Sequence, residues 1–180
     1  MKVNLGIYSA LIALVALPAC LSAQKVGEKA PDWSETVSTG KRTSGAELQK
    51  NGPYVLYFIK IGCPVNEPLV GFYNQIAQSY KGVQFLGVID GNAKAFESWN
   101  KKHKVTFPVV LDPNKKVIKA FGAQASPWVI VVNQNGTFGR IDPGSSQARL
   151  NALNQFAART AKAPVAKIDF SRAPARDTFG

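Results

Sequence analysis

YVLYFIKIGCP, which occupies residues 54–64, is the stretch that decides the fold. Its first six residues are apolar, aromatic or β-branched without interruption, which is typical of a strand buried on both faces. Lys60-Ile61-Gly62-Cys63 then predicts a tight turn. Downstream of Pro64, apolar residues recur at three- and four-residue spacing as far as Tyr80, which predicts a helix that begins at Pro64. The stretch therefore predicts a strand–turn–helix unit with Cys63 in the turn.

Outward from this unit, strands and helices alternate along the chain. Further buried strands are predicted over residues 83–89 and 128–132, and a short extended segment over residues 107–111. Asn133-Gln134-Asn135-Gly136 predicts a hairpin turn that leads into a partner strand. Helices are predicted over residues 93–104, 112–121 and 145–160. This order indicates an α/β fold with a central mixed β-sheet flanked by helices on both faces.

The two ends of the chain differ from this central part. Residues 1–23 combine a positive start, a short uncharged apolar run and small residues, which is typical of a signal peptide, with a retained anchor as the alternative. Cleavage after Ala23 would leave Gln24 first, whereas cleavage before Cys20 would leave a lipidated cysteine. Residues 161–180 contain two prolines, four basic residues and few large apolar side chains, so a flexible basic tail is predicted. The domain is expected over residues 24–160.

The net charge of the chain limits the classes of binding partner that can be expected. The formal net charge is +11, and residues 1–23 contribute one charge, so about +10 remains after export. Export argues against nucleic acid as a partner, and no basic run or basic–aromatic motif of that kind is present. We expect a solubilising basic surface, with membrane attachment only if Cys20 is lipidated. Because one histidine and one cysteine remain after export, no metal is expected, and no cofactor is predicted.

Four segments resemble the thioredoxin-like redoxins of the AhpC/TSA and TlpA type. They are Val26–Asp32, Tyr54–Phe58 continuing into Gly62-Cys63-Pro64, Phe107–Pro113, and Ser126-Pro127 before residues 128–132 with the Asn135-Gly136 turn. The resemblance spans about residues 26–160. It implies a thioredoxin-like fold in which Cys63 holds the position of the reactive thiol.

Neither standard mechanism of these redoxins is complete in this sequence. Reductases with a Cys-x-x-Cys motif have a second cysteine where Cys63-Pro64-Val65-Asn66 has asparagine. The peroxiredoxin pattern P-x-x-x-T-x-x-C has Leu56 at its proline position and Lys60 at its threonine position. Arg140 is a weak candidate for a catalytic arginine, because it follows the hairpin turn.

Cys63 is the candidate nucleophile. Unpaired backbone N–H groups at a helix start stabilise a thiolate, and Lys60 would add positive charge. A thiolate attacks disulfides and peroxides. Asn66 can form hydrogen bonds but cannot resolve a mixed disulfide, so an external thiol would complete each cycle. The alternatives are that Cys63 is a small buried apolar residue and that Asn66 only starts the helix.

The resemblance also assigns a substrate-binding position. It implies that Pro127 is a cis-proline beside Cys63 and that Ser126 offers its backbone to a substrate strand, with a trans strand-entry proline as the alternative. Pro64, which follows Cys63, is predicted to be a further substrate-binding residue.

Three other polar side chains give weaker signals. His103 lies among lysines at a helix end, where a solvated side chain is expected. Asp90 and Glu67 are proton-carrier candidates near the thiol or, alternatively, solvated carboxylates.

Together these features predict an exported, periplasmic or secreted, thiol-dependent oxidoreductase. Cys63 would reduce a disulfide or, as in a peroxiredoxin-like antioxidant, a peroxide. An external thiol reductant or a partner protein disulfide would be its reaction partner. The alternative is a redox-inactive thioredoxin-like module that binds extended peptides at Pro127. Alkylation of Cys63 near neutral pH separates the two hypotheses.

Overall fold

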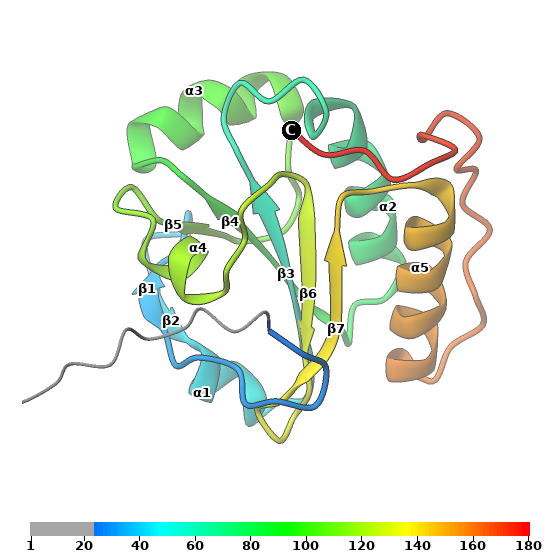
Figure 1. The fold of residues 1–180 in the computed structure, drawn as a ribbon, viewed down its shortest axis with the longest axis horizontal. Coiled ribbons are helices and arrows are strands. Elements are labelled where there is room, and N and C mark those ends of the chain that lie inside the picture. The colour runs from blue at the N-terminus through cyan, green and yellow to red at the C-terminus, as the bar shows by residue number, and fades with distance from the viewer. Residues whose placement is uncertain (1–23) are drawn as a thin grey trace, which may run out of the picture.

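The computed structural model describes residues 24–180, so the expected signal peptide and both cleavage sites lie outside the described residues. A five-stranded mixed sheet forms the centre of the molecule, in the order β5-β4-β3-β6-β7 (Figure 1). Its strands are β3 (Tyr54–Ile59), β4 (Gln84–Ile89), β5 (Val109–Leu111), β6 (Trp128–Val132) and β7 (Phe138–Pro143). The pairs β3–β4 and β4–β5 are parallel, whereas β6 is antiparallel to both β3 and β7. As predicted, the apolar run at residues 54–59 is the central strand, and all six of its residues are buried.

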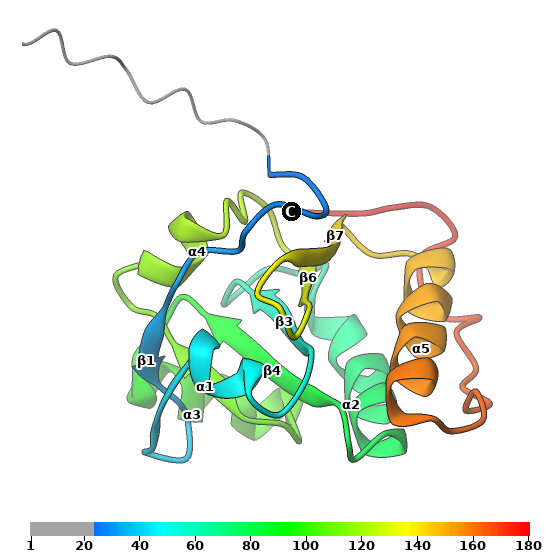
Figure 2. The same ribbon diagram turned by 90° about the horizontal axis from the view of Figure 1, so that it is seen from below.

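Helices cover both faces of this sheet, which confirms the expected thioredoxin-like α/β architecture (Figure 2). They are α1 (Gly45–Gln49), α2 (Val70–Ser79), α3 (Ala93–His103), α4 (Lys116–Ala120) and α5 (Gln147–Ala161). A small antiparallel hairpin, β1 (Ser34–Thr36) with β2 (Arg42–Ser44), forms a separate two-stranded sheet before α1.

Alternating side chains of β3 divide the apolar interior into two layers. Val55, Tyr57 and Ile59 pack with residues of α2, α3 and α5. Their neighbours Tyr54, Leu56 and Phe58 pack with α4 and the segment that contains β1. Successive side chains of a strand point to opposite faces, so one uninterrupted apolar run supplies both layers. Full burial of side chains of this size contributes about 1.5–3 kcal/mol each.

The helix after Cys63 begins later than the sequence predicts. Instead of starting at Pro64, the chain passes through a turn and a 3-10 helix (Glu67–Leu69) before α2 begins at Val70. Pro68 explains the delay, because proline has no backbone N–H and disfavours the α conformation in the residue before it. Cys63 therefore lies in a turn, where its backbone N–H donates to the Lys60 carbonyl at 3.2 Å, and not in the first turn of α2.

The segment after α5 also differs from the expectation of a flexible tail. Phe170 and Ala173 are buried in the layer that contains α2 and α5, and the Phe170 ring lies edge-on to Phe72 with 5.6 Å between centroids. In Figure 1 the red trace passes α5 and α2 and returns toward the sheet. Composition alone pointed to flexibility because large apolar residues are few in this segment. Two buried side chains and a series of hydrogen bonds hold it against the domain.

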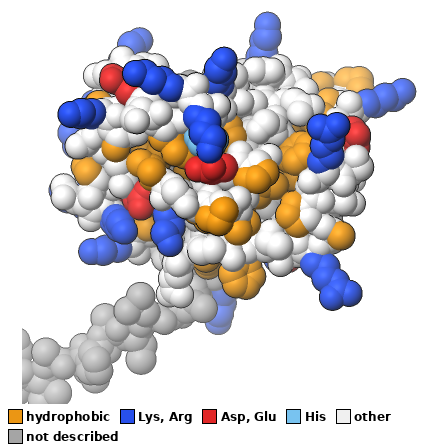
Figure 3. Space-filling model, turned by 90° about the horizontal axis from the view of Figure 1, so that it is seen from above, with side chains coloured by type: hydrophobic (Ala, Val, Ile, Leu, Met, Phe, Trp, Pro, Cys, Tyr) orange, Lys and Arg blue, Asp and Glu red, His pale blue; other side chains and the backbone are white. Residues whose placement is uncertain are grey.

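The surface of residues 24–180 carries basic side chains with apolar side chains between them. Figure 3 shows lysine and arginine side chains spread over one face, with apolar side chains between them. Within residues 24–180, no helix is both long enough and apolar enough to cross a bilayer. In this same range, no three His, Cys, Asp or Glu side chains gather into a group that could hold a metal ion.

Candidate functional site

Cys63 follows the carboxyl end of β3 and is almost fully buried, with 4% of its surface exposed. Its Sγ lies 3.7 Å from the carbonyl oxygen of Ser126, which is 63 residues away in the sequence. The contact arises because β3 and β6 are antiparallel neighbours, so the loop after β3 meets the loop before β6. The Ser126–Pro127 peptide bond is cis, as the resemblance implies. The structure thus brings together the expected thiol and the expected strand-binding loop.

A buried polar network joins these two loops. Asn66 is fully buried, its Nδ2 donates to the Lys60 carbonyl at 2.8 Å, and its Oδ1 contacts the Ser126 hydroxyl. That hydroxyl also lies 3.1 Å from the Phe58 carbonyl oxygen and accepts the Lys60 N–H at 3.2 Å. Since a hydroxyl carries one proton, it donates to Asn66 or to Phe58 at any moment. Asn66 therefore ties the Cys63 turn to the Ser126 loop.

Tyr57 supports this network from the core, a role that the sequence analysis missed. Its hydroxyl donates to the Asn66 carbonyl at 3.3 Å, and its ring stacks on Tyr73 with 3.9 Å between centroids. Burial raises the pKa of the Tyr57 hydroxyl well above its ordinary value, and Tyr73 and Cys63 add smaller contributions. The hydroxyl consequently stays protonated and remains a donor. A tyrosine within an apolar run gives no sequence signal beyond a place in the core.

Lys60 acts in the site through its backbone. Its N–H and its carbonyl both bond to the Asn66–Ser126 network, whereas its side chain is exposed and lines a cavity of about 260 Å³ beside Ser126 and Gly180. Pro64, the other expected neighbour of the thiol, is exposed.

Asp90 fixes the turn before Cys63. Its Oδ1 accepts the Ile61 N–H at 3.0 Å, and its Oδ2 lies 3.8 Å from Lys115 Nζ. From the sequence, Asp90 is expected to be a proton carrier or a solvated carboxylate. In the structure it anchors the loop that carries the thiol.

Glu67 and His103 belong to a different cluster. Glu67 pairs with Lys102 at 3.1 Å and with His103 Nε2 at 3.4 Å. The His103 ring stacks on Trp99 with 4.5 Å between centroids, and 7% of its side chain is exposed. The expectation of a solvated histidine is wrong, because the ring is packed between Trp99 and Glu67. Glu67 is engaged with α3.

Arg140 is committed to another ion pair. It bonds to the carboxylate of the buried Asp142 on β7, and Arg149 donates to the same carboxylate at 2.7 Å. The doubt about a catalytic role for Arg140 thus has a physical basis, because the Asp142 carboxylate on β7 already neutralises its charge.

The last residue of the chain closes the site. Gly180 and Ser126 form a reciprocal backbone pair, with N···O distances of 2.7 Å from Gly180 to Ser126 and 3.0 Å in the other direction. A Cβ atom on residue 180 would lie 2.9 Å from Cys63 Sγ, so Gly180 lies directly over the thiol. Nothing in the local sequence of residues 177–180 signals this contact.

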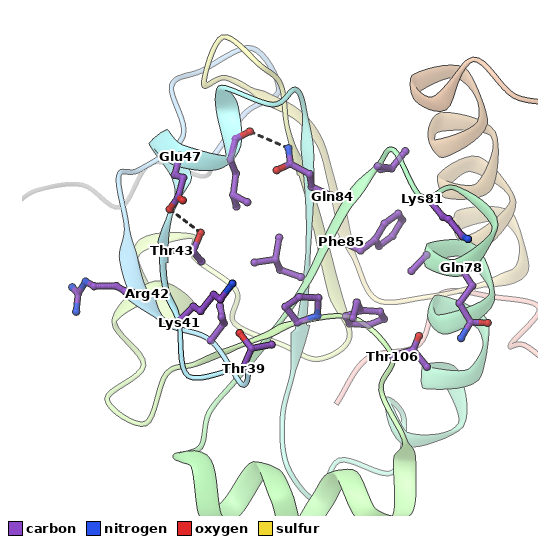
Figure 4. A pocket seen from close by; sticks show the side chains of 17 residues that line it. Thr39, Lys41, Arg42, Thr43, Glu47, Gln78, Lys81, Gln84, Phe85 and Thr106 are labelled. Atoms are coloured by element: carbon purple, nitrogen blue, oxygen red, sulfur yellow. Dashed lines mark hydrogen bonds between the residues drawn. The ribbon is translucent and has the colours of Figure 1, made fainter.

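A larger cavity, of about 750 Å³, lies apart from the thiol (Figure 4). It is lined by the β2–α1 segment, the end of α2, the start of β4 and the loop before β5, with Thr43, Glu47, Gln78, Phe85 and Thr106 among its residues. Neither Cys63 nor Asn66 nor Ser126 contributes to its wall. The larger opening is therefore separate from the thiol chemistry.

Comparisons with known proteins agree with the geometry. The thiol-disulfide oxidoreductase ResA of Bacillus subtilis (strain 168) is 29% identical over 125 residues, which cover 66% of this chain and 68% of that protein. ResA of Geobacillus kaustophilus is 28% identical, with 69% and 72% covered.

Solved structures share the fold at lower identity. The thioredoxin domain of a thiol-disulfide oxidoreductase from Bacteroides vulgatus matches with a TM-score of 0.64 and 18% identity, covering 75% of this chain and 99% of that one. The peroxidoxin BcpB from Mycobacterium tuberculosis matches with a TM-score of 0.63 and 15% identity, covering 78% and 97%. At these identities the likeness shows the fold alone. The sequence model of the AhpC/TSA family matches residues 26–140, and the chain therefore belongs to the AhpC/TSA family.

Proposed function

We propose that this chain is an exported thiol-disulfide oxidoreductase that works with Cys63 as its single redox-active cysteine. The observation that carries the proposal is the 3.7 Å contact between Cys63 Sγ and the Ser126 carbonyl, because it places the thiol beside a backbone that pairs with an extended strand. The named activity of the ResA relatives supports the same chemistry.

A disulfide suits this site better than a peroxide. The peroxiredoxin threonine position holds Lys60, whose side chain is exposed, and the candidate arginine, Arg140, is paired with Asp142. Ser126, by contrast, presents both its N–H and its carbonyl to an adjacent strand, the arrangement by which extended peptides add to an exposed backbone edge. The cavity of about 260 Å³ beside Ser126, with Lys60, Lys115 and Asp90 in its wall, leaves room for a substrate side chain.

The reaction proceeds by two exchanges. The Cys63 thiolate attacks one sulfur of a substrate disulfide, so a Cys63–substrate disulfide forms and the other substrate sulfur leaves as a thiolate. Asn66 holds the turn but supplies no second thiol, and Cys63 is the only cysteine between residues 24 and 180. An external thiolate then attacks the substrate sulfur of the mixed disulfide, which forms a new external disulfide and releases the Cys63 thiolate.

A second candidate, a redox-inactive peptide-binding module, is favoured by the burial of Cys63. A thiol that is 4% exposed reacts only when its cover moves. In this alternative the Ser126 backbone would still bind an extended peptide, but no covalent adduct would form.

Intact mass after separate incubations with oxidised glutathione and with hydrogen peroxide tests the proposal. We expect a glutathione adduct on the wild-type chain and no adduct on Cys63→Ser. Faster oxidation by peroxide than exchange with disulfide would move the assignment to peroxide reduction. A folded wild-type chain that gains no mass with either reagent would favour the binding module.

The exported location rests on residues 1–23 and has its own test. N-terminal sequencing of envelope or secreted fractions should find Gln24 first, or a chain that begins at a lipidated Cys20. An intact Met1 in those fractions would contradict both forms.

A further inference from the structure

The tail formed by residues 162–180 is fixed to the domain at successive points. Near its start, Ala166 bonds through its N–H to Tyr80 and through its carbonyl to Asn154, with distances of 2.7 and 2.9 Å. Further along, the Gln147 side chain donates to the carbonyl of Ala173 at 3.0 Å, and the Gln147 N–H donates to Pro174 at 2.9 Å. The tail is therefore guided along α5 toward the Cys63 site, as the red trace in Figure 1 shows.

Its last four residues, Asp177–Gly180, bind the open end of the β6–β7 hairpin. Thr178 and Ser145 exchange two backbone hydrogen bonds, at 3.1 and 3.0 Å, and Gly180 and Ser126 exchange two more. The Asp177 carboxylate receives Arg149 Nη2 at 2.7 Å. This segment thus adds an extended edge to the hairpin through a single β-bridge, and it is held by backbone pairing and by one charge-assisted bond.

The same segment determines how exposed the thiol is. The Ser126 carbonyl that accepts the Gly180 N–H is also the group 3.7 Å from Cys63 Sγ. With a Cβ clearance of 2.9 Å to Sγ and 3.6 Å to Val65, residue 180 has room for glycine and for nothing larger without a shift. A substrate strand cannot use the Ser126 backbone while Gly180 occupies it.

We propose that Asp177–Gly180 is an intramolecular ligand that covers Cys63, and that an extended polypeptide segment must displace it to reach the thiol. The tail defines the partner that fits. It is an extended segment with a small residue opposite Ser126 and an acidic residue three positions earlier, facing Arg149. This inference rests on the proposed function, since displacement of the tail has a consequence only if Cys63 reacts with the segment that replaces it.

The rate at which iodoacetamide alkylates Cys63 in the full chain tests the cover, because it needs no disulfide substrate. Gly180→Val and Asp177→Lys should each speed alkylation by at least about tenfold, since one removes the fit over Sγ and the other replaces a charge-assisted bond by repulsion. Asp169→Lys is the matched control, because Asp169 lies in the same tail and bonds locally to Ser171. That variant should react at the wild-type rate.

A second arm tests the partner. The peptide Ala-Arg-Asp-Thr-Phe-Gly, added to the Asp177→Lys chain, should slow alkylation again, and the same peptide with Asn for Asp should do so less. Equal rates for wild type, Gly180→Val and Asp177→Lys, with all three folded, would overturn the proposal. So would an added peptide that leaves the Asp177→Lys rate unchanged. If the cover opens as expected but no variant forms a mixed disulfide, the proposed oxidoreductase function fails while the intramolecular ligand stands.

Discussion

Two hollows of this molecule differ in what surrounds them. At the carboxyl end of β3 the space is small, about 260 Å³, and Ser126 and Gly180 in its wall form hydrogen bonds with each other, while Cys63 and Asn66 contact Ser126. At the amino end of β4, the cavity of about 750 Å³ is wide, and Thr39, Lys41 and Gln78 line it without the thiol. The comparison teaches that the paired polar groups gather at the smaller space and not at the larger one. We call these regions the thiol end and the wide cavity.

The largest loss of folding stability is expected where the tail packs into the core. Phe170→Ala removes a buried ring and should destabilise the fold by about 3 kcal/mol, which lowers Tm by roughly 6–12 °C for a domain of this size. Phe179→Ala is the matched control, because that ring is 62% exposed and its loss should stay within about 0.5 kcal/mol. Equal Tm values for the two variants in thermal unfolding would mean that the tail does not pack as described.

A smaller loss of stability is expected at the thiol end, and almost none in the wall of the wide cavity. Asn66→Ala removes a fully buried amide together with its bonds to the Lys60 carbonyl, which keeps only the Cys63 N–H, and to the Ser126 hydroxyl, and should cost about 2 kcal/mol, or roughly 4–8 °C in Tm. Gln78→Ala removes a comparable amide from the wall of the wide cavity, where the side chain is exposed, and should cost less than about 0.5 kcal/mol. Comparable losses in chemical denaturation would show that the thiol end is no more tightly constrained than the wide cavity.

The smallest effect is a pH dependence of the tail. Hydrogen bonding from Arg149 holds the pKa of the Asp177 carboxyl below its ordinary value, with help from Ser146. A lowered pKa in the docked state means that the ion pair contributes above the ordinary carboxyl pKa, about 3.9, and is lost as the pH falls through the lowered value. Asp142 faces the same guanidinium group, and Arg140 is paired with the Asp142 carboxylate.

Amide chemical shifts of Thr178 and Gly180 should therefore report release of the tail only below about pH 4. In Asp177→Asn the same amides should show no such transition in that window. An identical acid transition in both chains would assign the effect to another carboxylate.

The fold was accessible from the sequence because its signals are local. The apolar run at residues 54–59 and the Asn135-Gly136 turn mark strands and a hairpin by residue type alone. The start of α2 was placed too early because periodicity continues through Pro68, while the missing N–H of proline delays the helix. The position of Cys63 beside Ser126 came from the family resemblance.

The rest of the site depends on contacts between distant residues. The bond between Asn66 and the Ser126 hydroxyl joins residues 60 apart, and a buried asparagine cannot be told from a solvated one by its neighbours in sequence. The tail was misjudged for a related reason. Its hold comes from backbone pairing with Ser126 and Ser145, which leaves no trace in side-chain composition.

The lifetime of a Cys63 adduct tests the central claim most directly. The wild-type chain would be converted to its mixed disulfide with glutathione, freed of all small thiols, and followed by intact mass. Because Cys63 has no partner cysteine between residues 24 and 180, the adduct should persist for hours and vanish once reduced glutathione is added. An adduct that disappears without added thiol, or a folded chain on which none ever forms, would contradict the claim that Cys63 is a nucleophile resolved from outside.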